Sequence, residues 1–210
     1  MTKRKTKFDT CFFERYAMFS LVKLFGSRYL GLTCSDRPDL QDDENGIGIE
    51  VTRAISENKV DAHALINDMA GKPVMKVDPD DLKRIQESGY SFGLDSTYSM
   101  GNREYDYWAL ALPMKRILLS KIQKVSNGFY GNYNEFGLYV FTNYDLVAEE
   151  VNEIIGFVTE AQRDLEKHYD RLFITQIDTL FDCDLKKGHF DCFPIDSELR
   201  KQFYHYACLK

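Results

Sequence analysis

Hydrophobic and polar residues follow two different periods along this chain. Apolar residues recur at helical spacing from position 11 to 25, where one face carries Cys11, Met18, Leu21, Val22 and Phe25. Strict alternation appears instead over 47–53, where Ile47, Ile49 and Val51 lie on one side and Gly48, Glu50 and Thr52 on the other. The first pattern predicts a helix and the second predicts a strand.

The same patterns predict the remaining elements. We expect further helices over 57–69, 79–88, 113–125, 146–167 and 197–208, further strands over 37–41, 137–142 and 172–176, and loops over 91–106 and 127–135. Helices interspersed with strands in this order predict an α/β fold, with a mixed central β-sheet flanked by helices. We expect residues 1–210 to form a single domain in which residues 1–8 are a loose basic arm.

Composition narrows the class of protein. The chain has 210 residues, of which 44% are hydrophobic and 14% aromatic, so it can bury enough surface to offset the entropy cost of folding. The net charge of −6 excludes a uniformly basic surface for nucleic acid but leaves room for a local basic groove. No apolar run is long enough to span a membrane, and the five scattered cysteines are typical of reduced thiols. We therefore expect a cytoplasmic protein without a membrane partner.

An acidic hairpin is the first candidate for chemistry. Asn45-Gly46 is a strong signal for a two-residue turn, and such a turn places Gln41 opposite Glu50. Asp39 then points to the same face and becomes a diagonal cross-strand neighbour of Glu50. Two converging carboxylates repel each other unless a cation lies between them, and hard oxygen ligands suit Mg²⁺ or Mn²⁺.

This segment resembles a known family. Pro38-Asp39, a short hairpin and then Ile-Gly-Ile-Glu-Val-Thr over 47–52 are similar to the core of the PD-(D/E)XK nuclease superfamily. In that family two acids bind the metal, and a lysine two residues after the second acid orients or activates water. Asp39 and Glu50 match the two acids, whereas Thr52 occupies the lysine position. The resemblance implies a restriction-endonuclease-like core and a metal-dependent nuclease that hydrolyses phosphodiester bonds of nucleic acid, with DNA as the expected substrate.

Two charged residues in apolar faces extend this interpretation. Glu14 lies within the apolar face of the first helix, where an acid is costly unless it is paired or bound to a metal. Many superfamily members carry a glutamate on the helix before the hairpin, so the resemblance implies Glu14 as a third metal ligand. Lys121 projects from the apolar arc of the 113–125 helix. Some members move the catalytic lysine to such a helix, so Lys121 is the candidate for that role and Lys124 the second choice.

A basic, aromatic stretch follows the same helix. No Asp or Glu occurs from 107 to 134, which makes this stretch locally positive in an acidic chain. Basic side chains can follow a phosphate backbone while aromatic rings stack on bases. The sequence therefore predicts that nucleic acid is bound by Lys115, Arg116, Lys124, Tyr130 and Tyr133.

Simpler interpretations stay open for each feature. The hairpin acids can be solvated, Glu14 can form a salt bridge, and Lys121 can place its stem over the core with its amine in water. The spaced pairs His189 and Cys192, and His205 and Cys208, offer zinc ligands, although in an unusual order. The main alternative function is a catalytically inactive nuclease-fold protein that acts as a nucleic-acid-binding or protein-interaction subunit. Cutting both strands of DNA would favour a homodimer.

Overall fold

The computed structural model describes residues 11–54, 102–142 and 144–209, with side chains from Met114 onward in the second range. The chain divides into two compact units, one of residues 1–53 and 121–210 and the other of residues 54–120. The helices expected over 57–69 and 79–88 and the basic arm over 1–8 lie outside the described residues. The single-domain organisation stays a prediction.

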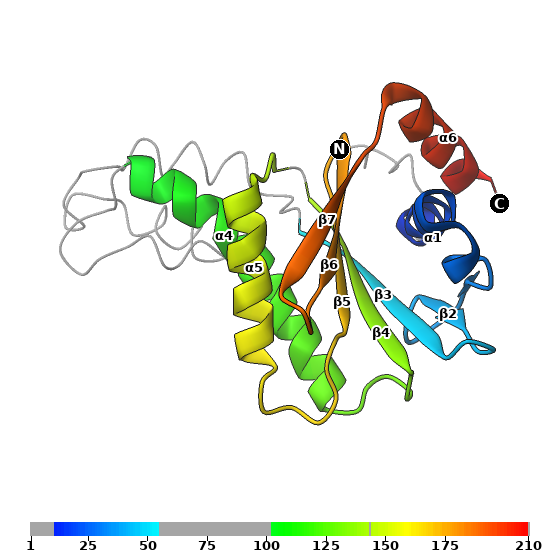
Figure 1. Ribbon diagram of the computed structural model, residues 1–210, viewed down its shortest axis with the longest axis horizontal. Coiled ribbons are helices and arrows are strands. Elements are labelled where there is room, and N and C mark those ends of the chain that lie inside the picture. The colour runs from blue at the N-terminus through cyan, green and yellow to red at the C-terminus, as the bar shows by residue number, and fades with distance from the viewer. Residues whose placement is uncertain (1–10, 55–101, 143, 210) are drawn as a thin grey trace, which may run out of the picture. The chain divides into compact units, whose positions relative to one another are not determined.

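The first unit holds the sheet and most of the described helices (Figure 1). In chain order the elements are α1 (Phe12–Phe25), η1 (Gly26–Tyr29), β1 (Thr33–Cys34), β2 (Leu40–Asp42), β3 (Ile47–Arg53), α4 (Asn102–Ser126), β4 (Glu135–Phe141), α5 (Ala148–Ala161), β5 (Arg171–Thr175), β6 (Thr179–Asp184), β7 (His189–Pro194) and α6 (Ser197–Cys208). The part of α4 that belongs to this unit begins at Lys121. None of the helices among these elements is long and apolar enough to cross a membrane.

The seven strands form one mixed sheet whose spatial order is the same as their order in the chain. The pairs β3–β4 and β4–β5 are parallel, and the other neighbours are antiparallel. Parallel neighbours require a crossover, which α5 supplies between β4 and β5. The predicted α/β class with a mixed, helix-flanked sheet is therefore confirmed.

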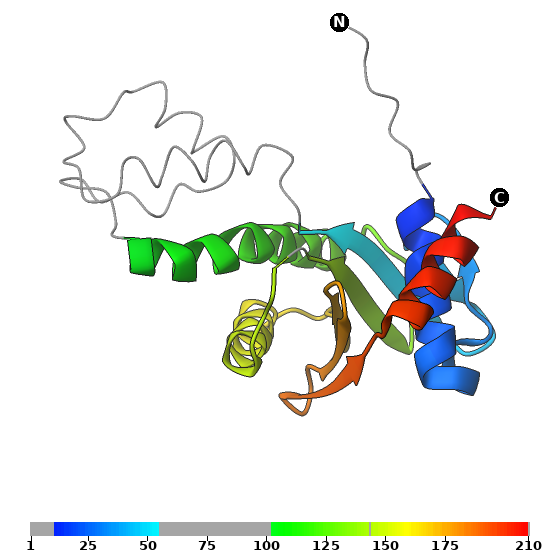
Figure 2. The same cartoon turned by 90° about the horizontal axis from the view of Figure 1, so that it is seen from above.

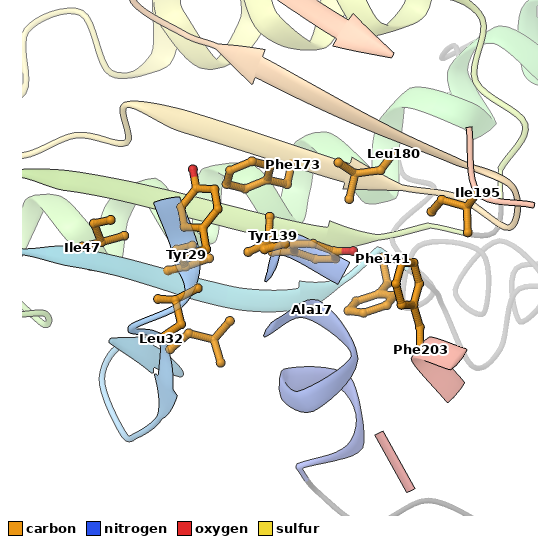
Figure 3. Packing of buried hydrophobic residues seen from close by; sticks show 13 residues of the cluster. Ala17, Tyr29, Leu32, Ile47, Tyr139, Phe141, Phe173, Leu180, Ile195 and Phe203 are labelled. Atoms are coloured by element: carbon orange, nitrogen blue, oxygen red, sulfur yellow. The ribbon is translucent and has the colours of Figure 1, made fainter. Parts of the chain in front are cut away.

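Helices cover both faces of the sheet within this unit. In Figure 2, α1 and α6 run side by side on one face and α5 lies on the other. The Arg15 side chain links the two neighbouring helices by donating to the Ala207 carbonyl at 2.8 Å. Figure 3 shows the core between α1 and the sheet, where the rings of Tyr139, Phe141 and Phe173 pack together. Alternate residues of β3 complete this core, so the others point to the α5 face.

The hairpin register differs from the expected one by two residues. Leu40 pairs with Ile49 and Asp42 with Ile47, so the turn contains four residues instead of two. The Asp42 carboxylate explains the wider turn, because it accepts from the Asn45 backbone N–H at 3.1 Å and from its side chain at 2.7 Å. A shift of two residues keeps every side chain on its expected face, because strand side chains alternate with a period of two.

Helix ends differ from the sequence expectation in two places. α4 begins at Asn102, so Pro113 lies inside the helix. The loop predicted over 91–106 is therefore wrong for residues 102–106, which are helical. α5 covers only Ala148–Ala161 instead of 146–167. The Gln162 side chain ends it, because it both donates to and accepts from the Tyr169 backbone and so folds the chain back toward β5.

The β6–β7 hairpin was not anticipated from the sequence. Its signal in the sequence is Gly188, whose φ of 64° supplies the left-handed turn that glycine accepts readily. The strand predicted over 37–41 is shorter and later, because Arg37 has a φ of 64° that no strand residue adopts.

Candidate active site

Asp39 lies directly before β2, at the end of the ladder with β3. Continuing the observed register by one step places Asp39 opposite Glu50, where a diagonal relation was expected. Its Oδ2 atom accepts a hydrogen bond from the Val51 backbone N–H at 2.7 Å. The carboxylate is half-buried and fixed in orientation by β3 itself.

Glu50 lies in the middle of β3 on the face opposite the α1 core. Only 7% of the residue is exposed, which is rare for a glutamate unless it is paired. The Lys121 ammonium donates to Oε1 of Glu50 at 2.5 Å, and its own side chain is 15% exposed. The lysine predicted to project from an apolar helix arc therefore reaches the second acid of the hairpin. This ion pair joins β3 to the C-terminal part of α4.

The acids and the lysine act on one another electrostatically. The pKa of Asp39 is raised from 3.8 to about 6, chiefly by burial and then by the charge of Glu50, while the Val51 N–H opposes the shift. Glu14 also raises the pKa of Asp39, and Lys121 lowers it. A carboxylate perturbed by burial and by two other carboxylates is typical of a functional site. Asp39 thus interacts electrostatically with the three other residues that the sequence singled out for this site, Glu50, Glu14 and Lys121.

Two tyrosines line the same acids from the other side. Tyr130 is 5% exposed and Tyr169 is fully buried, and the Tyr130 hydroxyl lies close enough to Glu50 and to Tyr169 to interact with both. Burial raises the pKa of both hydroxyls, and the negative charge of Glu50 adds to it. Both phenols therefore stay protonated and can donate hydrogen bonds toward the carboxylates. The sequence proposed Tyr130 as a surface ring for bases, but its ring is covered, and Tyr169 was not anticipated.

Tyr133 is more accessible than Tyr130. Its ring stacks on Phe136 with centroids 5.5 Å apart and covers Gly48, where an added Cβ would lie 2.8 Å from the ring. With Asn132, Lys167 and neighbouring residues it lines an open cavity of about 280 Å³. Tyr133 thus remains available to a ligand at the edge of the site.

The basic residues separate into two groups. Lys124 is exposed in the first unit, with its ammonium 5.3 Å from the centre of the Phe129 ring. Lys115 is half-buried and Arg116 is exposed on α4, within the second unit, residues 54–120. Of the basic residues described in the first unit, Lys121 contacts the acid cluster through Glu50, and Lys124 lies over the Phe129 ring.

Thr52 and the zinc candidates contribute neither charge nor metal ligands to the acid cluster. Thr52 lies on the same face of β3 as Glu50 and carries no charge, so only Lys121 supplies an ammonium to that acid among the residues described in β3 and α4. His189 and Cys192 are three residues apart on β7, so they point to opposite faces and cannot hold one ion together. Within the described ranges, no group of three or more His, Cys, Asp or Glu side chains is close enough to hold a metal ion.

Comparison of the chain with family models, curated proteins and solved structures found no match. The arrangement of the site is therefore interpreted from its own geometry.

Proposed function

We propose that this chain is a metal-dependent nuclease that hydrolyses phosphodiester bonds of nucleic acid, with DNA as its substrate. The observation that carries the proposal is the convergence of Asp39 and Glu50 at one point of the sheet, with the Lys121 ammonium on Glu50. The resemblance to the PD-(D/E)XK superfamily rests on the first two residues. The position of Lys121 supplies the positive charge that Thr52 lacks, and this supports a restriction-endonuclease-like core.

The donor set fits a hard divalent cation. The Val51 N–H donates to Oδ2 of Asp39 and the Lys121 ammonium donates to Oε1 of Glu50, so Oδ1 and Oε2 would be the atoms that hold a cation. Carboxylate oxygens with water as the remaining ligands suit Mg²⁺ or Mn²⁺. Among the described residues Glu14 does not form a three-acid group with Asp39 and Glu50, so it would act through such a water rather than as a direct ligand. When bound, the cation would lower the pKa of a coordinated water and neutralise charge on the phosphate.

The chain's own residues provide orientation and charge. The Val51 N–H holds the Asp39 carboxylate in place, and the protonated phenol of Tyr130 stands beside Glu50. Lys121 carries a positive charge to the point where negative charge develops on the phosphate, so it can orient the attacking water or stabilise the transition state. Burial of the ion pair strengthens these interactions relative to water.

Cleavage of plasmid and single-stranded DNA in Mg²⁺ or Mn²⁺, compared with EDTA, tests the proposal. We expect metal-dependent cleavage that Asp39→Asn and Glu50→Gln each reduce at least a hundredfold. Asp36→Asn is the matched control, because Asp36 is a nearby carboxylate whose side chain is 86% exposed. Cleavage that survives both substitutions at the site would refute the assignment.

The Glu50–Lys121 ion pair also favours a second candidate. A buried carboxylate that is already neutralised by a lysine needs no cation, which is the arrangement expected in a catalytically inactive nuclease-fold protein. Such a subunit would bind nucleic acid or another protein. It would bind DNA equally well in Mg²⁺ and in EDTA and cleave it in neither. A homodimer would be expected only for cleavage of both strands, and sedimentation of the protein with and without duplex DNA would test it.

A further inference from the structure

An exposed aromatic ring lies close to two cations that are near the acid cluster in the chain. Phe129 is 45% exposed, in the loop that follows α4. The Arg37 guanidinium lies 5.0 Å from the centre of its ring, and the Lys124 ammonium lies 5.3 Å from it. We call these three residues the Phe129 platform. A ring beside two cations can both stack on a flat group and attract negative charge.

The platform is tied to the candidate active site through both of its cations. Arg37 precedes Asp39 by two residues, which limits their separation to about 7 Å of chain. Lys124 follows Lys121 by three residues on α4, so their side chains emerge about one turn apart on neighbouring parts of the helix surface. If a phosphate of a nucleic-acid strand is bound at the acids, a neighbouring nucleotide of that strand would therefore lie at Phe129.

The backbone at Arg37 supports a functional arrangement. Its φ of 64° lies in the left-handed region, where a residue with a side chain is strained. Such strain is found where the surrounding structure holds a side chain in a required place. The Asp36 carboxylate lies 3.5 Å from Nε of Arg37, but it is 86% exposed, so this surface pair binds the guanidinium only weakly. The charge of Arg37 remains available to a ligand.

We infer that the Phe129 platform binds an unpaired base of single-stranded DNA by stacking, while Arg37 and Lys124 contact the flanking phosphates. This inference rests on the proposed function and names its substrate as a single-stranded segment or a frayed end. A ring or guanidinium plane stacks on any base, so the platform selects for an exposed base and is tolerant of sequence. Paired bases inside a duplex present no free face to it.

Fluorescence of single-stranded DNA with one 2-aminopurine, measured in EDTA so that no cleavage occurs, tests the inference. We expect Phe129→Ala to weaken binding about tenfold and to remove the quenching of the probe. Tyr204→Ala is the matched control, because Tyr204 is also 45% exposed but lies on α6. We expect this control to bind like the wild type. Wild-type affinity and quenching in Phe129→Ala would overturn the inference.

Salt dependence tests the two cations separately from the ring. Each phosphate contact on a single strand contributes about 0.7 to the slope of log affinity against log salt, so Arg37→Gln with Lys124→Gln should lower the slope by about 1.4. The exposed lysines Lys186 and Lys201, changed to glutamine together, are the control. An unchanged slope in the first pair would overturn the phosphate role. Two results would overturn the assignment to single-stranded DNA: Phe129→Ala weakens the binding of duplex DNA as much as that of single-stranded DNA, or it weakens the binding of RNA alone.

The two proposals can fail separately. Metal-dependent cleavage together with unaltered binding by Phe129→Ala would support the nuclease proposal and refute the role of the platform. Binding that depends on Phe129, without cleavage in any metal, would support the role of the platform and refute the nuclease proposal.

Discussion

The cost of ionising the half-buried Asp39 carboxyl in the folded state predicts that removing its charge stabilises the metal-free protein. The folded state raises the pKa of this carboxyl from 3.8 to about 6, chiefly by burial and then by the charge of Glu50. Ionising it in the folded state therefore costs up to about 3 kcal/mol. Asp39 is half-buried, and solvent screening reduces this to about 1–2 kcal/mol. Asp39→Asn removes the charge and keeps an oxygen that can accept from Val51.

The pH dependence follows from the direction of the shift. Between about pH 4 and pH 6 the folded state binds more protons than the unfolded state, so the wild type loses stability as the pH rises through this window. Above pH 7 the full cost applies, and Asp39→Asn should be more stable by about 1–2 kcal/mol. Near pH 4 the wild-type carboxyl is protonated in the folded state, so the difference should largely disappear.

Urea denaturation in EDTA at pH 4.5 and pH 8 measures this difference. Asp36→Asn removes the same formal charge from an exposed position and should change the free energy of unfolding by less than about 0.5 kcal/mol at either pH. A variant at Asp39 that is less stable than the wild type at pH 8, or a gap that does not change with pH, would refute the reasoning.

Further predictions concern the lysine, a glycine and the metal. Lys121→Met should destabilise the chain by about 3–5 kcal/mol in chemical denaturation, because it leaves a buried carboxylate unpaired, whereas exposed Lys124→Met should cost about 0.5 kcal/mol at most; equal costs would contradict the pairing. Gly48→Ala should cost about 1–3 kcal/mol through contact with the Tyr133 ring, and Gly156→Ala, which meets no atom within 4 Å, should cost nothing. A hundredfold excess of Mg²⁺ over its dissociation constant should stabilise the wild type by about 2.7 kcal/mol. An unchanged melting temperature in saturating Mg²⁺ would speak against the metal site.

Several elements could be predicted because one strong local signal decides each of them. The alternation over 47–53 fixes β3, and the Asp196 cap, which accepts from two backbone N–H groups, fixes the start of α6. The β6–β7 hairpin was missed because Asp182 and Asp184, which make it look polar, are paired with Arg171 inside the structure. Single-sequence patterns carry no information about such a tertiary partner.

The candidate site could be predicted in part for similar reasons. Asp39 and Glu50 follow from a local hairpin, and their shared face survived a shift of register because that shift was even. Lys121 could be found because a charge in an apolar helix arc needs a partner. Phe129 and Tyr130 are adjacent aromatic residues, and the sequence does not show that the first is exposed and the second buried. That distinction depends on how the loop after α4 packs against the sheet.

The strand order has a consequence for how the molecule acquires its chemistry during folding. Each strand pairs with its neighbour in the chain, so the β2–β3 hairpin and the β5–β7 meander close short loops and can form early. The β3–β4 pair must instead wait for closure of a loop that contains residues 54–134, whose entropy cost is larger. Asp39 and Glu50 therefore meet in a local hairpin before Lys121 reaches them. We expect Asp39 and Glu50 to come together first, and Lys121 to pair with Glu50 last, in the slow phase of refolding.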